Sequence, residues 1–172
     1  MLLALLEIGT VSALAVYLIR WRADVRRRNS QTWESLLARL RPDWSARALS
    51  DHFLWTDKLD STPEEAWSSM DGPKGLWVMY HNTRVMMEMA DYAARNSETV
   101  NPLVLDTLRI DAIHIRLFVL MAIGQYALSE ASQKVRVNAF RAASMYLIMA
   151  SRMMRLLQEN AAGIVPDFVA AM

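Results

Sequence analysis

The sequence predicts an all-α protein, in which an N-terminal membrane-anchor helix precedes an antiparallel helical bundle of three long helices plus short helices. Glycine and proline are scarce, at five each, while methionine is abundant, at 12, a balance that favours helices over a sheet rich in turns. The first nineteen residues are almost entirely apolar. After residue 75, apolar residues recur at intervals of three and four, which is the period of a helix with one face in a core.

Composition and charge exclude several classes of protein. The chain has no cysteine, which excludes disulfides, zinc ribbons and cysteine nucleophiles. Its net charge of +1 conceals an uneven distribution. Residues 20–47 carry eight arginines against three acids, whereas residues 51–106 carry ten acids against four bases. Nucleic-acid binding normally requires a stronger and more extended basic excess, so no nucleic-acid partner is expected.

Residues 1–19 contain a single charge, Glu7. As a helix they would span about 28 Å, close to the ~30 Å thickness of the hydrocarbon layer. The arginines follow the apolar stretch, whereas in a cleaved signal peptide they precede it. The segment is therefore predicted to be a signal anchor. The alternative is an apolar helix inside a soluble protein or oligomer, which Glu7 favours because a carboxylate within a membrane costs a few kcal/mol.

The basic collar after this segment predicts its orientation. Arginines remain on the cytoplasmic side, so the chain is expected to be a single-pass protein, of the bacterial inner-membrane type, with its N-terminus outside and its body in the cytoplasm. Membrane lipid is then one partner. The residues predicted to set the orientation are Tyr17, Trp21, Arg20, Arg22, Arg26, Arg27 and Arg28.

Three regions follow from this pattern: residues 1–28 form the anchor and collar, 29–70 short amphipathic helices, and 71–172 the bundle core. In the second region, one short helix is predicted from Trp33 to Pro42 and another from Asp43. These helices either lie on an anionic membrane surface or fold onto the bundle. A third helix begins at Thr62, which precedes a proline and two glutamates, and runs to about Met70.

The third region contains the long helices. After a break at residues 71–75, helices are predicted over 76–96, 102–128 and from about 133 to Asn160, and Gly163 and Pro166 mark the end of the last. Short links make them antiparallel neighbours, with the short helices of residues 30–70 as the fourth side. The first carries one polar stripe of His81, Arg84, Glu88, Asp91 and Arg95. The last is expected to turn inward Val135, Ala139, Ala142, Tyr146, Met149 and Met153.

Metal-site candidates are weak. Di-iron bundles need Glu-x-x-His pairs on two helices, whereas this chain offers a single Asp-x-x-His, Asp111 to His114. His81, Glu88 and His52 could converge with that pair, but a surface Asp–His pair is the simpler interpretation. No phosphate loop, nucleophile elbow or zinc-protease motif is present. No metal, no cofactor and no catalytic residue are therefore predicted.

Two apolar features leave alternatives open. Methionines gather at 79, 86, 87 and 89 and at 145, 149, 153 and 154; they fill a core, line a pliable groove, or bind Cu(I). Residues 117–123 are apolar around the whole helix, and are expected to be enclosed in the bundle. Otherwise one side of them meets a second subunit or the anchor.

The function that fits these observations is a membrane-anchored helical interaction or scaffold protein with no recognisable catalytic site, bound to a protein partner or to further copies of itself. The alternative is a metal- or small-ligand-binding four-helix-type bundle, which could be an enzyme.

Overall fold

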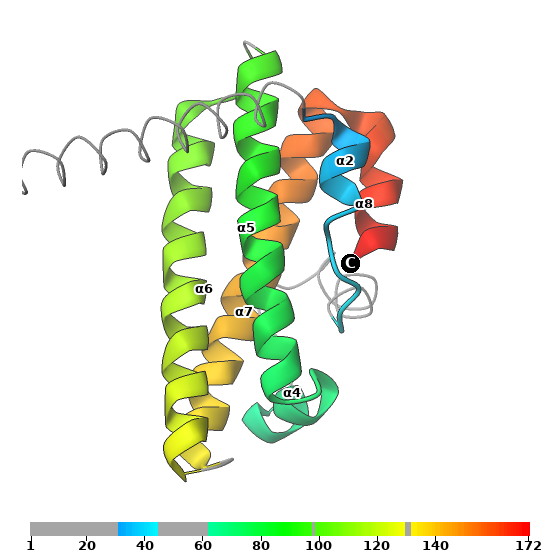
Figure 1. The fold of residues 1–172 in the computed structure, drawn as a ribbon. Helices are drawn as coiled ribbons and strands as arrows, with labels where there is room; N and C mark the ends of the chain where they lie inside the picture. Colours follow the sequence, from blue (N-terminus) through cyan, green and yellow to red (C-terminus); the bar gives the residue numbers. More distant parts are fainter. Residues whose placement is uncertain (1–30, 45–61, 98, 130–131) are drawn as a thin grey trace, which may run out of the picture. The chain divides into compact units, whose positions relative to one another are not determined.

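The computed structural model describes residues 31–44, 62–97, 99–129 and 132–172. Residues Trp33–Met172 form one compact unit. Its frame is three long antiparallel helices, α5 (Pro73–Asn96), α6 (Pro102–Ser129) and α7 (Gln133–Asn160) (Figure 1). Every regular element of the described residues is helical, which confirms the all-α bundle. The anchor, its collar and the helix expected from Asp43 onward fall almost entirely outside the described residues.

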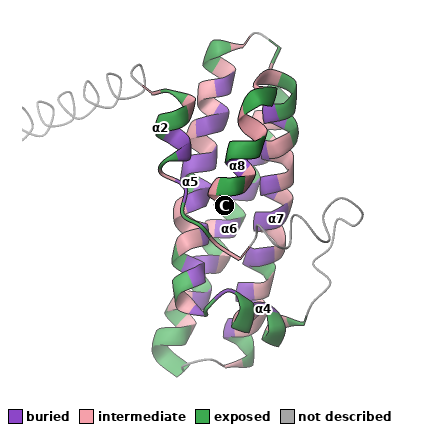
Figure 2. Cartoon of the chain, turned by 90° about the vertical axis from the view of Figure 1, so that its right-hand side faces the viewer, coloured by how far each residue is buried: buried purple, intermediate pink, exposed green. Residues whose placement is uncertain are grey.

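Four short elements complete the described part of the chain: α2 (Trp33–Leu37), α4 (Pro63–Ser69), the 3-10 turn η1 (Ala162–Ile164) and α8 (Val165–Ala171). α2 and α8 lie on the opposite side of α5 and α7 from α6 (Figures 1 and 2). They therefore occupy the fourth side of the bundle. The apolar side chains that attach this side are Leu36, Leu37, Leu40, Phe168 and Met172, all buried.

Helix α8 is not in the sequence prediction, which took Gly163 and Pro166 as the end of the last long helix and placed no further helix after them. Pro166 instead lies in the first turn of α8, where proline's missing N–H is not needed. Phe168 then becomes fully buried. A helix of seven residues has too few turns to show a clear period, so its existence depends on the surface that it covers.

The link between α4 and α5 is shorter than predicted. The Thr62 hydroxyl accepts the amide N–H of Glu65 at 3.3 Å and the Glu65 carboxylate accepts the amide of Thr62 at 2.8 Å, so α4 begins with a capping box. Asp71 and Gly72 then turn the chain with positive φ angles of 62° and 57°. Residues 73–75, expected to be part of the break, already form the first turn of α5, since proline is favourable at that position.

The core lies between α5, α6 and α7. All six residues of α7 predicted to face inward are fully buried, and so are Met79, Met86 and Met89 of α5. These methionines therefore fill the core, as their adaptable shape allows. Buried alanines on α5 and α7 let the helices approach closely; they are Ala90, Ala93, Ala139, Ala142, Ala143 and Ala150.

Candidate interaction surface

A network of buried and partly buried hydrogen bonds attaches the segment after α2 to α5 and α7. Asn82, fully buried on α5, accepts the amide of Arg41 at 2.9 Å and donates to the Arg41 carbonyl at 2.8 Å. Its amide also lies 3.1 Å from Asp43 Oδ2 and 3.0 Å from the Tyr146 hydroxyl. That hydroxyl donates to Asp43 at 2.7 Å. The amide of Asp43 in turn donates to the carbonyl of Met172.

A second set of contacts uses the polar stripe of α5. Arg39 forms a two-pronged pair with Glu88, at 2.5 and 3.0 Å, and His81 Nε2 donates to the Arg39 carbonyl at 2.9 Å. Arg84, one helical turn before Glu88 in the same stripe, also pairs with it, at 3.2 Å. The polar stripe of α5 therefore binds the segment after α2 and does not only face solvent. Residues 33–44 fold onto the bundle. For this segment, that is one of the two alternatives that the sequence left open, the other being a membrane surface.

The Arg39–Glu88 pair predicts a dependence of stability on pH. The hydrogen bond from Arg39 lowers the pKa of Glu88 below its ordinary value. A carboxyl group whose pKa is lowered by folding stabilises the folded state above its unfolded pKa, and this contribution is lost as the pH falls through the folded pKa. Glu88→Gln should lower the free energy of unfolding by about 1 kcal/mol at neutral pH. The difference from wild type should shrink below about pH 4.5, measured by denaturant unfolding across that range.

The matched control is Asp71→Asn. Asp71 pairs with Lys74 at 3.1 Å, but both side chains are largely exposed, and such pairs contribute little. Its effect should be close to zero at every pH. If lowering the pH reduces the free energy of unfolding by the same amount in wild type and in Glu88→Gln, the role assigned to the Arg39–Glu88 pair is contradicted.

The structure separates the four candidate metal ligands. His81 and Glu88 are engaged with Arg39 as described. Asp111, expected at the surface, is buried and forms an ion pair with Arg152 of α7, whereas His114 is exposed. Among the described residues, no group of three or more His, Asp or Glu side chains is placed to hold a metal ion. His52 and the predicted orientation residues, Tyr17, Trp21 and the arginines of the collar, lie outside the described residues.

Of the three long helices, α6 has an apolar side that the other described residues leave uncovered. Leu108, Ala112, Ile115, Val119 and Ala122 are buried. Outside this stripe the helix carries two exposed charged residues near its start, Asp106 and Arg109, and its exposed side is mostly apolar from Ile110 onward. The side chains on the opposite side, with their exposed fractions, are Leu103 72%, Ile110 55%, Ile113 65%, Leu117 51%, Leu120 49%, Met121 43% and Leu128 89%. We call these seven residues, together with the exposed Gly124, the outer face of α6.

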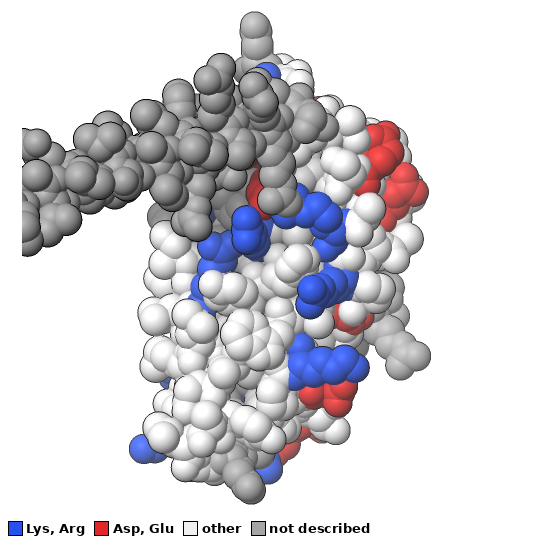
Figure 3. All heavy atoms as spheres, viewed as in Figure 1, with Lys and Arg blue, Asp and Glu red and all other residues white. Residues whose placement is uncertain are grey.

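This surface overturns the prediction that residues 117–123 are enclosed. Leu117, Leu120 and Met121 are about half exposed, because the short elements cover α5 and α7 and leave α6 uncovered. Figure 3 shows the result: below the grey atoms, the surface over α6 is mostly white, while basic side chains gather toward α5. The sequence signal for this surface was the unbroken apolar run itself, which has more apolar positions than one buried face can use.

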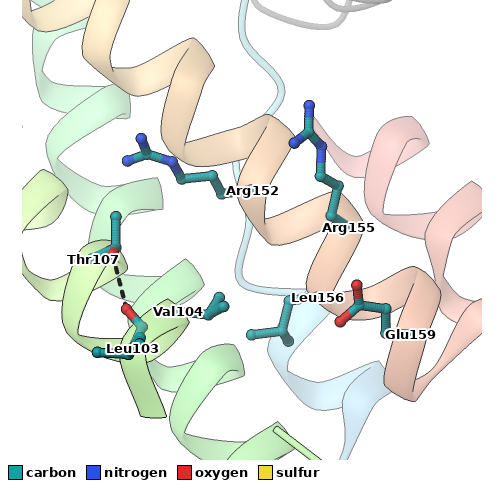
Figure 4. Close-up of a pocket in the computed structure, with 7 residues that line it drawn as sticks. All are labelled: Leu103, Val104, Thr107, Arg152, Arg155, Leu156 and Glu159. Atoms are coloured by element: carbon teal, nitrogen blue, oxygen red, sulfur yellow. Dashed lines mark hydrogen bonds between the residues drawn. The ribbon is translucent and has the colours of Figure 1, made fainter. Parts of the chain in front are cut away.

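A groove of about 380 Å³ borders the outer face of α6 near its first turn, between α6 and α7 (Figure 4). Leu103, Val104 and Leu156 provide its apolar wall, and Arg155 and Glu159 of α7 also line it. Arg152, which enters the groove from α7, is already paired with Asp111. The groove therefore joins the outer face of α6, through Leu103, to a mixed apolar and charged surface on α7.

No helix of the described residues is both long enough and apolar enough to cross a membrane. Among models of protein families, curated proteins and solved structures, none matches this chain. The function must therefore be argued from the surface itself.

Proposed function

We propose that this chain is a membrane-anchored helical interaction or scaffold protein, and that the outer face of α6 is where it docks a protein partner. One observation carries the docking proposal. The seven side chains of this face expose roughly 800 Å² together, if a fully exposed aliphatic residue presents on the order of 200 Å², and a monomer rarely exposes an apolar patch above a few hundred Å².

Physical reasons favour a protein partner for this face. Exposed apolar area of this size is unfavourable in water, and a bound protein would remove it. Between Ile110 and Leu128 the face contains no Asp, Glu, Lys or Arg, and such charge depletion is typical of the centre of an interface. Arg109 and Arg116 lie along its α5 side, where Arg109 pairs with Asp91 at 3.4 Å and Arg116 stacks 5.5 Å from the Tyr80 ring. An apolar centre with a charged rim results.

The membrane part of the proposal is supported by the sequence of residues 1–28. The apolar stretch is long enough to cross the hydrocarbon layer, and the arginines that follow it would hold the bundle on the cytoplasmic side. A tether of this kind would present the outer face of α6 to other membrane-bound proteins, because it confines the bundle near the membrane.

One experiment tests both parts. The full chain is expressed, the membranes are pelleted, and the protein is extracted in mild detergent and sized. We expect it in the pellet and, after extraction, in an assembly larger than one chain. Ile113→Glu with Leu117→Glu should leave the protein folded and in the pellet but reduce the assembly to single chains, because two buried unpaired charges are costly.

Gln158→Glu is the matched control, since Gln158 is exposed on α7 and lies outside the outer face. It should leave the assembly unchanged. Wild-type protein in the supernatant would reject the anchor. An assembly that survives the double substitution would reject the outer face of α6 as the docking surface.

A further inference from the structure

The outer face of α6 has one partner that the chain always supplies, which is another copy of the same face. Resting on the function proposed above, we propose that two copies of this chain dimerise by packing their α6 helices together, outer face against outer face. In such a symmetric dimer the same patch is used by both copies, so the patch must be complementary to itself.

The area is sufficient for this pairing. A stable interface buries about 800 Å² on each partner, which is close to the roughly 800 Å² that the face exposes. A single helix pair reaches this value only if both helices are apolar over many turns. The outer face extends from Leu103 to Leu128, and its positions recur at helical spacing over almost the whole of α6.

The composition of the face suits a second copy. From Ile110 to Leu128 it offers no acid or base to oppose its own copy, so like charges do not meet along that part of the patch. The exposed Asp106, between Leu103 and Ile110, is already paired with Arg109 at 2.9 Å. His114, exposed beside Ile113, is the polar exception. A partner with a strongly charged docking site would find charges only at the edge of this face, such as Arg109.

Gly124 adds a geometric argument. It lies within α6 and on the outer face, and a Cβ placed on it would meet no atom within 4 Å. Glycine inside a helix is less stable than alanine by up to about 1 kcal/mol, and the bundle itself does not require it. In the dimer it would allow a side chain of the second α6 to approach the backbone closely.

Leu117 lies near the middle of the face, so it would lie near its own counterpart whether the two helices run parallel or antiparallel. The chain has no cysteine, so Leu117→Cys introduces the only thiol. Packed helices lie about 8–10 Å apart, which a short bismaleimide crosslinker can span. We expect purified full-length Leu117→Cys in detergent to yield a covalent dimer at least about tenfold faster than Gln158→Cys, because its effective concentration is higher.

Two further measurements keep the outcomes distinct. The mass of the purified wild-type protein, corrected for detergent, should be that of two chains, and Ile113→Glu with Leu117→Glu should halve it. Equal crosslinking at positions 117 and 158 would overturn the proposal, because contact through the anchor alone would produce it. A monomeric wild type would also overturn it. If membrane extracts then still contained an assembly that the double substitution abolishes, the partner would be another protein, and the proposed function would stand without the dimer.

Discussion

Gly75→Ala should lower the free energy of unfolding by about 3 kcal/mol, although replacing glycine by alanine in a helix ordinarily stabilises it. Gly75 lies in the first turn of α5 and packs against Met70, the residue that follows α4. A Cβ at this position would lie 2.8 Å from the Cβ of Met70 and 2.9 Å from its carbonyl carbon. Backbone atoms cannot rotate away as a side chain can, so the α4–α5 link must shift and part of the core must shift with it.

The measurement is the denaturant midpoint of the full chain, followed by circular dichroism. Gly163→Ala is the control, because a Cβ there would meet nothing within 4 Å and Gly163 has no positive φ. Its effect should stay within about 0.5 kcal/mol. A Gly75→Ala protein as stable as Gly163→Ala would show that α5 does not approach Met70 as closely as described.

Asn82→Leu should cost about 3 kcal/mol, although leucine has the same number of side-chain heavy atoms as asparagine and the same branch point at Cγ. The substitution removes partners from Arg41, Asp43 and Tyr146 together. Tyr146 is buried and Asp43 is half-buried, so water replaces the lost hydrogen bonds poorly at these groups, and each such loss costs about 1–3 kcal/mol. Tyr146→Phe, which removes a single hydroxyl of the same network, should cost only about 1 kcal/mol.

Hydrogen exchange separates this effect from general destabilisation. The Arg41 amide donates to Asn82, so its exchange should accelerate in Asn82→Leu more than exchange in the middle of α7. Release of residues 38–44 would expose Leu40 and weaken the contact with Met172. Uniform acceleration throughout the bundle would indicate that Asn82 only contributes to the core and does not hold this segment.

Long helices with a strict apolar period were the predictable part of this protein. The inward positions of α7 needed only the 3.6-residue period, because a side chain's place around a helix follows from its position in the sequence. The start of α4 was equally local, since Thr62 and Glu65 satisfy each other's backbone groups within four residues.

Pairings across the bundle were not predictable in the same way. The sequence placed Asp111 beside His114, on the basis of helical spacing, but the structure turns Asp111 toward Arg152, 41 residues later. Glu88 similarly pairs with Arg39, 49 residues before it. A charged side chain has several candidate partners along the chain, and which of them it meets depends on the packing of whole helices.

The outer face of α6 shows this division most clearly. By itself the sequence determined that the protein is helical, where the long helices lie and that residues 117–123 are apolar all round. Only the tertiary structure decided which side of α6 stays uncovered, because this depends on where the short helices settle. They cover α5 and α7, attached by Asn82, Glu88 and the residues of α8, and a three-helix frame covered on that side alone leaves α6 facing outward.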